Sequence, residues 1–218
     1  MKEKELFEII KKEYERHMEN DERLVRPFVI GIDGRCGAGK STLAQRLSQI
    51  YNGGVIHMDD FFLPPSLRTT ERLDEPGGNV HYERFINEVA LPLRKSRATV
   101  SYRRFDCGIM DYSDEIKIST DNMVIIEGSY ALHPKIEEHI EIYNMKLFCT
   151  VDPELQKQRI LARNGEDSYK NFRDKWIPME ERYFDQCLGI DFERGVEMSP
   201  KSVFSGSQRP FVLVELTE

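Results

Sequence analysis

The sequence contains little cysteine and no long hydrophobic run. Its four cysteines stand far apart, without the paired spacing of a metal site or the density of a disulfide framework. The N-terminal segment MKEKELFEIIKKEYERHMEN mixes charges throughout and lacks the apolar stretch that a signal peptide or a membrane span requires. We therefore expect reduced thiols, a cytoplasmic protein and no membrane partner.

Positive charge is also in deficit. The 218 residues carry 31 lysines and arginines against 38 acidic residues, which gives a formal net charge of -7 and a pI near 5.4. Proteins that bind nucleic acid usually present an excess of basic residues, so this composition argues against a nucleic-acid partner. The length suits one α/β domain with a well-buried core.

The chain is expected to begin with a helix that packs on this domain. Within residues 1–26, the stretch 3–18 places its apolar residues near one helical face, with lysines and glutamates elsewhere. The rest of the chain, 27–218, reads as one domain. The apolar positions of the first helix are Leu6, Phe7, Ile9, Ile10 and Tyr14.

Short apolar runs then alternate with helical patterns. This alternation predicts an α/β fold with a doubly wound parallel sheet between two helical layers. Residues 61–80 and 106–122 read as irregular, as does 195–208. Asn164-Gly165 is expected to end one helix. The expected strands are 28–32, 55–58, 99–105, 123–126, 145–151 and 211–215, and the expected helices are 41–51, 82–95, 136–142, 153–163 and 171–187.

The stretch FVIGIDGRCGAGKST carries the strongest functional signal. Gly34, Gly39, Lys40 and Ser41 match the glycine, four-residue spacer, glycine, lysine, serine pattern of a P-loop, placed after a strand and before a helix. The backbone amides and the lysine neutralise phosphates, and the serine hydroxyl can reach Mg²⁺. We expect ATP and Mg²⁺ here, bound by Gly34, Arg35, Cys36, Gly37, Ala38, Gly39, Lys40, Ser41 and Thr42.

A second signal lies at the end of the second expected strand. The stretch HMDDFFLPP places Asp59 and Asp60 where an open α/β sheet binds its ligands. A carboxylate at this position can accept a proton from a hydroxyl group. The chain has no Asn-Lys-x-Asp guanine-binding motif. A kinase is therefore favoured over a GTPase.

Three stretches together, GIDGRCGAGKST, MDDFF and VIIEGSYAL, resemble the uridine kinase and phosphoribulokinase superfamily of P-loop kinases. The resemblance covers residues 28–163. It implies a nucleoside-kinase-like P-loop NTPase fold in which Asp59 is the general base toward the acceptor hydroxyl. It also implies that Glu127, with Ser41 and Asp60, binds Mg²⁺ or its waters.

The same resemblance implies a short lid that closes over the phosphates at about 159–172. Arg159 and Arg163 are four residues apart and share one helical face, so both could reach a phosphoryl group. We expect them to join Lys40 and Asp59 in catalysis. Trp176 is expected to pack on a helix face.

The acceptor region departs from the uridine kinase pattern. GGNVHYERF places His81 where such kinases hold the ribose with an aspartate, and VSYRRFDCGIMDYSD has no histidine to contact a pyrimidine. We expect His81, Tyr102 and Arg104 to contact the acceptor.

The resemblance therefore leaves several functions open. An acceptor similar to uridine or cytidine is expected, with a ribosyl-pyridine or a sugar phosphate as alternatives. A catalytically silent ATP-binding regulator also fits the sequence. The sequence leaves a homo-oligomer open.

Overall fold

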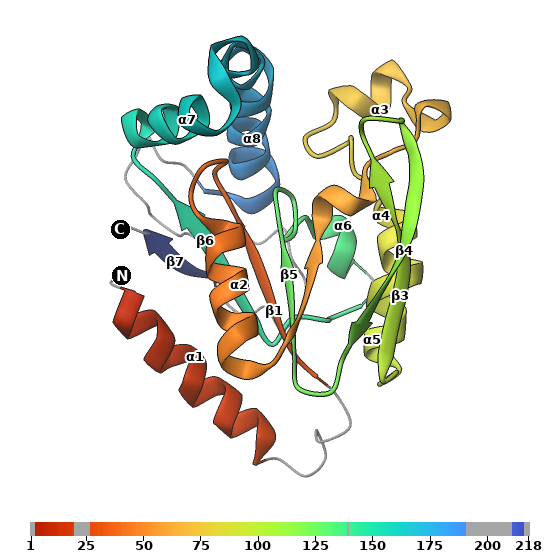
Figure 1. Ribbon diagram of the computed structural model, residues 1–218, viewed down its shortest axis with the longest axis vertical. Coiled ribbons are helices and arrows are strands. Elements are labelled where there is room, and N and C mark those ends of the chain that lie inside the picture. Colours follow the sequence, from red (N-terminus) through yellow and green to blue (C-terminus); the bar gives the residue numbers. More distant parts are fainter. Residues whose placement is uncertain (1–2, 20–26, 139, 191–210, 216–218) are drawn as a thin grey trace.

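The structure of the protein, a computed structural model, describes residues 3–19, 27–138, 140–190 and 211–215. Five parallel strands form one sheet in the order β2-β5-β1-β6-β7 (Figure 1). Their carboxyl ends therefore lie at the same edge. The strands are β1 Phe28–Gly34, β2 Gly54–His57, β5 Met123–Glu127, β6 Met145–Thr150 and β7 Phe211–Glu215.

The two central strands are buried along their whole length. β1 pairs with β5 in the register Phe28↔Met123 and with β6 in the register Gly34↔Cys149. Gly34 is required at the end of β1, because an added Cβ would lie 1.9 Å from the carbonyl oxygen of Cys149. This close approach fixes where the chain leaves the sheet to form the following loop.

One face of the sheet is covered by α2, Lys40–Tyr51, and by α1, Glu3–Met18 (Figure 1). Leu6 and Ile10 of α1 are fully buried in a core that includes Leu43 and Leu47 of α2. The helix expected at 3–18 is therefore present and its apolar face is packed. Residues 20–26, which follow it, lie outside the described part of the chain.

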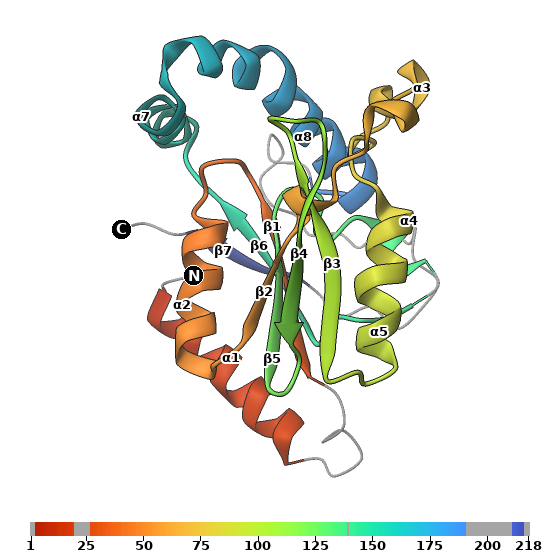
Figure 2. The same cartoon turned by 45° about the vertical axis from the view of Figure 1, so that its right-hand side comes forward.

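The other face is covered by helices and a hairpin. The hairpin β3-β4 lies between the β2 edge of the sheet and the segment α4-α5 (Figure 2). Helices on both faces of a parallel sheet confirm the predicted doubly wound α/β fold. The elements are α4 Tyr82–Phe85 and α5 Leu91–Arg94, joined by the π-helical turn Ile86–Ala90, β3 Thr99–Asp106, β4 Asp111–Ser119, α6 Pro134–Glu137 and α8 Ile177–Tyr183.

Several local predictions were wrong. The stretch 106–122, expected to be irregular, contains β4, which pairs with β3 in antiparallel register. The segment 61–80 is not structureless, since it forms a short 3-10 turn at Pro65–Leu67 and the helix α3 Thr70–Asp74, whose N-cap is Thr69. The helix expected at 136–142 is only α6. The irregular stretch expected at 195–208 lies outside the described residues.

The helical arm over the carboxyl edge of the sheet changes direction at Gly165. α7, Pro153–Asn171, begins at the N-cap Asp152, and Gly165 within it has the non-helical values φ 76° and ψ 172°, so the first regular helix ends there as expected. A second helical stretch follows the kink and continues into α8. Among the described residues, no helix is long and apolar enough to cross a membrane.

Candidate active site

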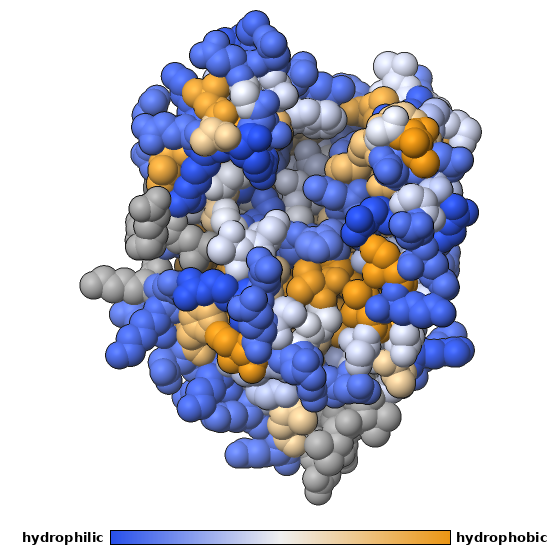
Figure 3. Space-filling model, viewed as in Figure 1, coloured by the Kyte–Doolittle hydropathy of each residue, from blue (hydrophilic) through white to orange (hydrophobic). Residues whose placement is uncertain are grey.

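A cavity of about 900 Å³ opens at the carboxyl edge of the sheet. Figure 3 shows the hollow between the α7-α8 side of the molecule and the α3 side. Its wall combines the loop after β1, the ends of β2 and β5, the segment 62–79 and the α7-α8 arm. The lining includes Cys36, Gly37, Ala38, Gly39, Lys40, Ser41, Thr42, Asp59, Glu127, Arg159 and Arg163.

The loop between β1 and α2 has the conformation of a phosphate cradle. Gly37 and Gly39 have φ values of 74° and 86°, which L side chains rarely adopt. The Lys40 ammonium is buried against the loop, donating to the carbonyl oxygens of Gly34 at 2.6 Å and Arg35 at 3.0 Å. The loop thus holds a cation at the N-terminus of α2, where an anion is stabilised.

Gly34 and Arg35 shape this loop without lining the cavity. Arg35 is buried and forms an ion pair with Glu181 of α8. The preceding residue on α8, Glu180, accepts the backbone N–H of Cys36 at 3.0 Å and the hydroxyl of Ser129 at 2.9 Å. Two consecutive carboxylates of α8 therefore hold the first residues of the phosphate loop.

Asp33, the residue before Gly34, anchors the phosphate loop to the core. Its fully buried carboxylate accepts the backbone N–H groups of Gly34, Tyr130 and Leu132 and the hydroxyl of Tyr183, at 2.7 to 3.1 Å. Burial raises the pKa of this carboxyl. Neither Asp33 nor Glu180 stands out in the sequence, because their roles depend on partners far away along the chain.

Oxygen ligands suitable for Mg²⁺ lie beside Lys40. The Ser41 hydroxyl lies 3.1 and 3.2 Å from the two carboxylate oxygens of Glu127, which is buried. Glu127 also contacts His57 Nδ1 at 2.5 Å, and this hydrogen bond raises the pKa of His57. A hydroxyl and a carboxylate next to a phosphate cradle are the hard ligands that Mg²⁺ prefers, so the residues fit this ion.

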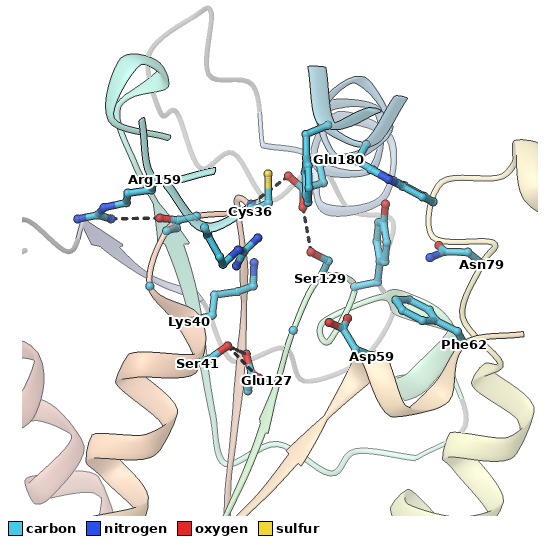
Figure 4. Close-up of a pocket in the computed structure, with 18 of the residues that line it drawn as sticks. Cys36, Lys40, Ser41, Asp59, Phe62, Asn79, Glu127, Ser129, Arg159 and Glu180 are labelled. Atoms are coloured by element: carbon cyan, nitrogen blue, oxygen red, sulfur yellow. Dashed lines mark hydrogen bonds between the residues drawn. The ribbon is translucent and has the colours of Figure 1, made fainter. Parts of the chain in front are cut away.

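Asp59 stands on the other side of the cavity from the phosphate loop, as Figure 4 shows. It lies in the short 3-10 turn Met58–Phe61 at the end of β2, and its side chain is exposed to the cavity. The surrounding protein raises its pKa by desolvation, and the nearby charge of Glu127 raises it further. A carboxylate of raised basicity facing a phosphate cradle can accept a proton there.

The two arginines of α7 both line the cavity. Arg159 donates to the carbonyl oxygen of Gly37 at 3.1 Å, which places it directly on the phosphate loop. Arg163 donates to the side chain of Asn164 at 2.7 Å, and its guanidinium lies 6.0 Å from the ring centroid of Phe172. Arg159 is thus the nearer of the two to the loop.

Besides Gly34 and Arg35, four other predicted residues do not line the cavity. Asp60, one residue from Asp59, points the other way and accepts the hydroxyl of Tyr102 and the Nε of Arg104, both at 3.1 Å. These three residues bind one another, so the geometry does not support Asp60 as a metal ligand or Tyr102 and Arg104 as acceptor contacts. His81 precedes α4, and burial lowers its pKa; the cavity wall carries Asn79 instead.

The Asp59 side of the cavity is lined by residues that the sequence did not identify. Phe62 and Asn79 lie on this side in Figure 4. Tyr130 and Trp176 also line the cavity. The double phenylalanine after Asp60 was a usable signal for Phe62.

Two relatives support a kinase. The sequence is 31% identical over 117 residues to uridine-cytidine kinase D of Dictyostelium discoideum, covering 54% of this chain and 23% of the relative's own length. It is 30% identical over 179 residues to human nicotinamide riboside kinase 1, covering 78% of this chain and 82% of that kinase. The chain belongs to the uridine kinase-like family of P-loop kinases.

A solved structure supports the fold of this uridine kinase-like protein. A Silicibacter protein provisionally named a fructose transport system kinase matches with a TM-score of 0.55 at 22% identity, covering 68% of this chain and 80% of that one. No family model matches the sequence. The assignment to the uridine kinase-like family thus rests on sequence relatives, and the assignment of the P-loop architecture rests on structural similarity.

Proposed function

We propose that this uridine kinase-like protein transfers the γ-phosphoryl group of ATP to a hydroxyl group of a nucleoside-like small molecule. The observation that carries the proposal is the placement of Lys40 and Asp59 on facing sides of one cavity. A phosphate cradle facing a carboxylate base is what in-line phosphoryl transfer to an alcohol requires.

The donor side of the cavity neutralises charge. Lys40, the loop amides and Arg159 surround the position of the phosphates, and Ser41 with Glu127 would hold Mg²⁺. When bound, Mg²⁺ neutralises charge on the phosphate oxygens. Since such transfer depends mostly on positioning and electrostatic stabilisation, these residues would supply most of the rate enhancement.

On the acceptor side, Asp59 would orient the hydroxyl and accept its proton. Its raised pKa makes it a stronger base than an ordinary aspartate. The proposed lid is the segment 159–172, which carries Arg159. It would exclude water and so protect the phosphoryl group from hydrolysis.

The acceptor side also favours a molecule with a flat ring. Phe62, Tyr130 and Trp176 supply aromatic surfaces and Asn79 supplies an amide that can both donate and accept hydrogen bonds. The relatives are named for ribosides: uridine and cytidine for one, and nicotinamide riboside for the other. We therefore propose a riboside as the acceptor, with its hydroxymethyl group at Asp59.

The test is acceptor-stimulated ADP release from MgATP by the purified protein. The panel contains uridine, cytidine, nicotinamide riboside, pantothenate and a pentose phosphate. Stimulation by one or more ribosides is the expected result. Stimulation by the pentose phosphate alone would mean that the acceptor is a sugar phosphate and not a riboside. ATP binding without stimulation by any compound would favour a catalytically silent ATP-binding protein.

A further inference from the structure

The cavity extends beyond the phosphate loop to the first turn of α1. Its wall includes Thr42 and Arg46 of α2 together with Glu3 of α1. Thr42 and Arg46 are four residues apart and therefore share one face of α2. The helix that precedes the first strand thus contributes a side chain to the cavity that contains Lys40.

Two groups from α1 hold the guanidinium of Arg46. Nη1 of Arg46 donates to a carboxylate oxygen of Glu3, and the guanidinium carbon lies 5.5 Å from the ring centroid of Phe7. The Arg46 side chain is nevertheless 53% exposed. A planar guanidinium supported by a ring can stack on a second planar group that enters from the cavity.

The support itself is anchored. Leu6 and Ile10, on either side of Phe7 along α1, have no exposed surface. One turn further on, Tyr14 packs edge-on against Phe28 of β1, with ring centroids 5.8 Å apart. Glu3 and Phe7 therefore lie on a helix fixed to the core, so the position of Arg46 is set before any ligand binds.

The direction of phosphoryl transfer indicates which planar group would reach Arg46. In-line transfer places the γ-phosphoryl group toward Asp59, so the opposite end of the nucleotide must point away from Asp59. Figure 4 shows Asp59 and Phe62 on one side of Lys40, with α2 on the other. Arg46 and Glu3 line the cavity along α2, which is the side away from Asp59.

We infer that Arg46, held by Glu3 and Phe7 of α1, stacks on the base of the donor nucleotide. The inference rests on the proposed function, because it assigns the base of the ATP whose phosphates lie at Lys40. It gives the N-terminal helix a part in the donor site and makes Arg46 a residue that contributes affinity for the nucleoside half of ATP.

The experiment compares two ligands by calorimetry in the presence of Mg²⁺: ATP, and inorganic tripolyphosphate, which has the phosphates without the base. Arg46→Ala should weaken ATP binding about three- to ten-fold and change tripolyphosphate binding less than about two-fold. Arg46→Lys should weaken ATP almost as much, because an ammonium keeps the charge but has no plane to stack. Lys11→Ala, which breaks the exposed ion pair between Lys11 and Glu15 of α1, should change the affinity for neither ligand.

Other outcomes would overturn the inference. Equal weakening of both ligands by Arg46→Ala, or full rescue by Arg46→Lys, would mean that Arg46 only attracts phosphate charge. Unchanged ATP affinity in Arg46→Ala would mean that the base lies elsewhere. Failure of the unmodified protein to bind ATP would overturn the proposed function as well. Melting temperatures of the variants, measured in parallel, establish that each is folded.

Discussion

Glu180 offers a test of how the phosphate loop is held. Its side chain is 4% exposed and accepts two hydrogen bonds, from the Cys36 amide and the Ser129 hydroxyl. Glu180→Ala would leave the buried Cys36 N–H without its acceptor, whereas the Ser129 hydroxyl can turn to water in the cavity. Removing the charged acceptor of a buried N–H, so that the N–H is left unpaired, costs about 2 to 3 kcal/mol. For a chain of this length, that corresponds to a melting temperature about 4 to 12 °C lower.

Glu180→Gln is the matched variant. Its amide oxygen can still accept the Cys36 N–H, so we expect a loss of about 1 kcal/mol or less. ATP should bind it at least as tightly as the unmodified protein, because the glutamine removes a negative charge from the cavity that receives the phosphates. Thermal melts and ATP titrations of both variants measure these effects, and Asp174→Asn, at an exposed pair with Arg173, serves as a control that should leave both unchanged. Equal destabilisation by alanine and glutamine would refute the hydrogen-bonding argument.

Three further predictions concern Asp59, His133 and Gly34. Asp59→Asn should raise the melting temperature at pH 7, because an acid whose pKa is raised by folding destabilises the protein wherever it is ionised; a lower melting temperature would contradict this. Burial lowers the pKa of His133 to about 4, so urea titrations should show stability falling by up to about 3 kcal/mol from pH 6.5 to 4, as the unfolded state binds the extra proton. A flat profile would mean that His133 is already charged in the fold. Gly34→Ala should not yield folded protein, since the Cβ would overlap the Cys149 carbonyl, whereas Gly165→Ala, with φ 76°, ψ 172° and no atom within 4 Å of the added Cβ, should fold with a loss of about 1 to 3 kcal/mol.

The donor half of the site could be predicted because its signals are local. The phosphate loop, from Gly34 to Ser41, is one continuous motif whose spacing fixes its geometry. Asp59 lies two residues after the end of β2 and Glu127 is the last residue of β5, and the carboxyl ends of parallel strands meet at one edge. Sequence position alone therefore brings these residues together.

The acceptor half could not be predicted, because it is assembled from segments that no local pattern connects. Asp59 and Asp60 are equivalent in the sequence, yet the short turn at the end of β2 directs only Asp59 into the cavity and leaves Asp60 bonded to β3. Asn79 comes from a loop, and Trp176 comes from the helical stretch that follows the kink at Gly165.

β4 was missed for a different reason. Its sequence DYSDEIKIS is rich in charge and half exposed, so it lacks the apolar run that marked the central strands. Ile116 and Ile118 alternate with charged residues and pack against the core, which is the period of a strand with one buried face. An alternation of only two apolar residues is a weaker strand signal than the longer apolar runs of the other strands.

The central claim is that Lys40 and Asp59 act on one phosphoryl group, and mass spectrometry of a riboside incubated with MgATP tests it most directly. The unmodified protein should yield the phosphorylated riboside. Lys40→Ala should lose both ATP affinity and product, whereas Asp59→Asn should keep ATP affinity and lose product about 10²- to 10⁴-fold. Undiminished product from either variant would contradict the account.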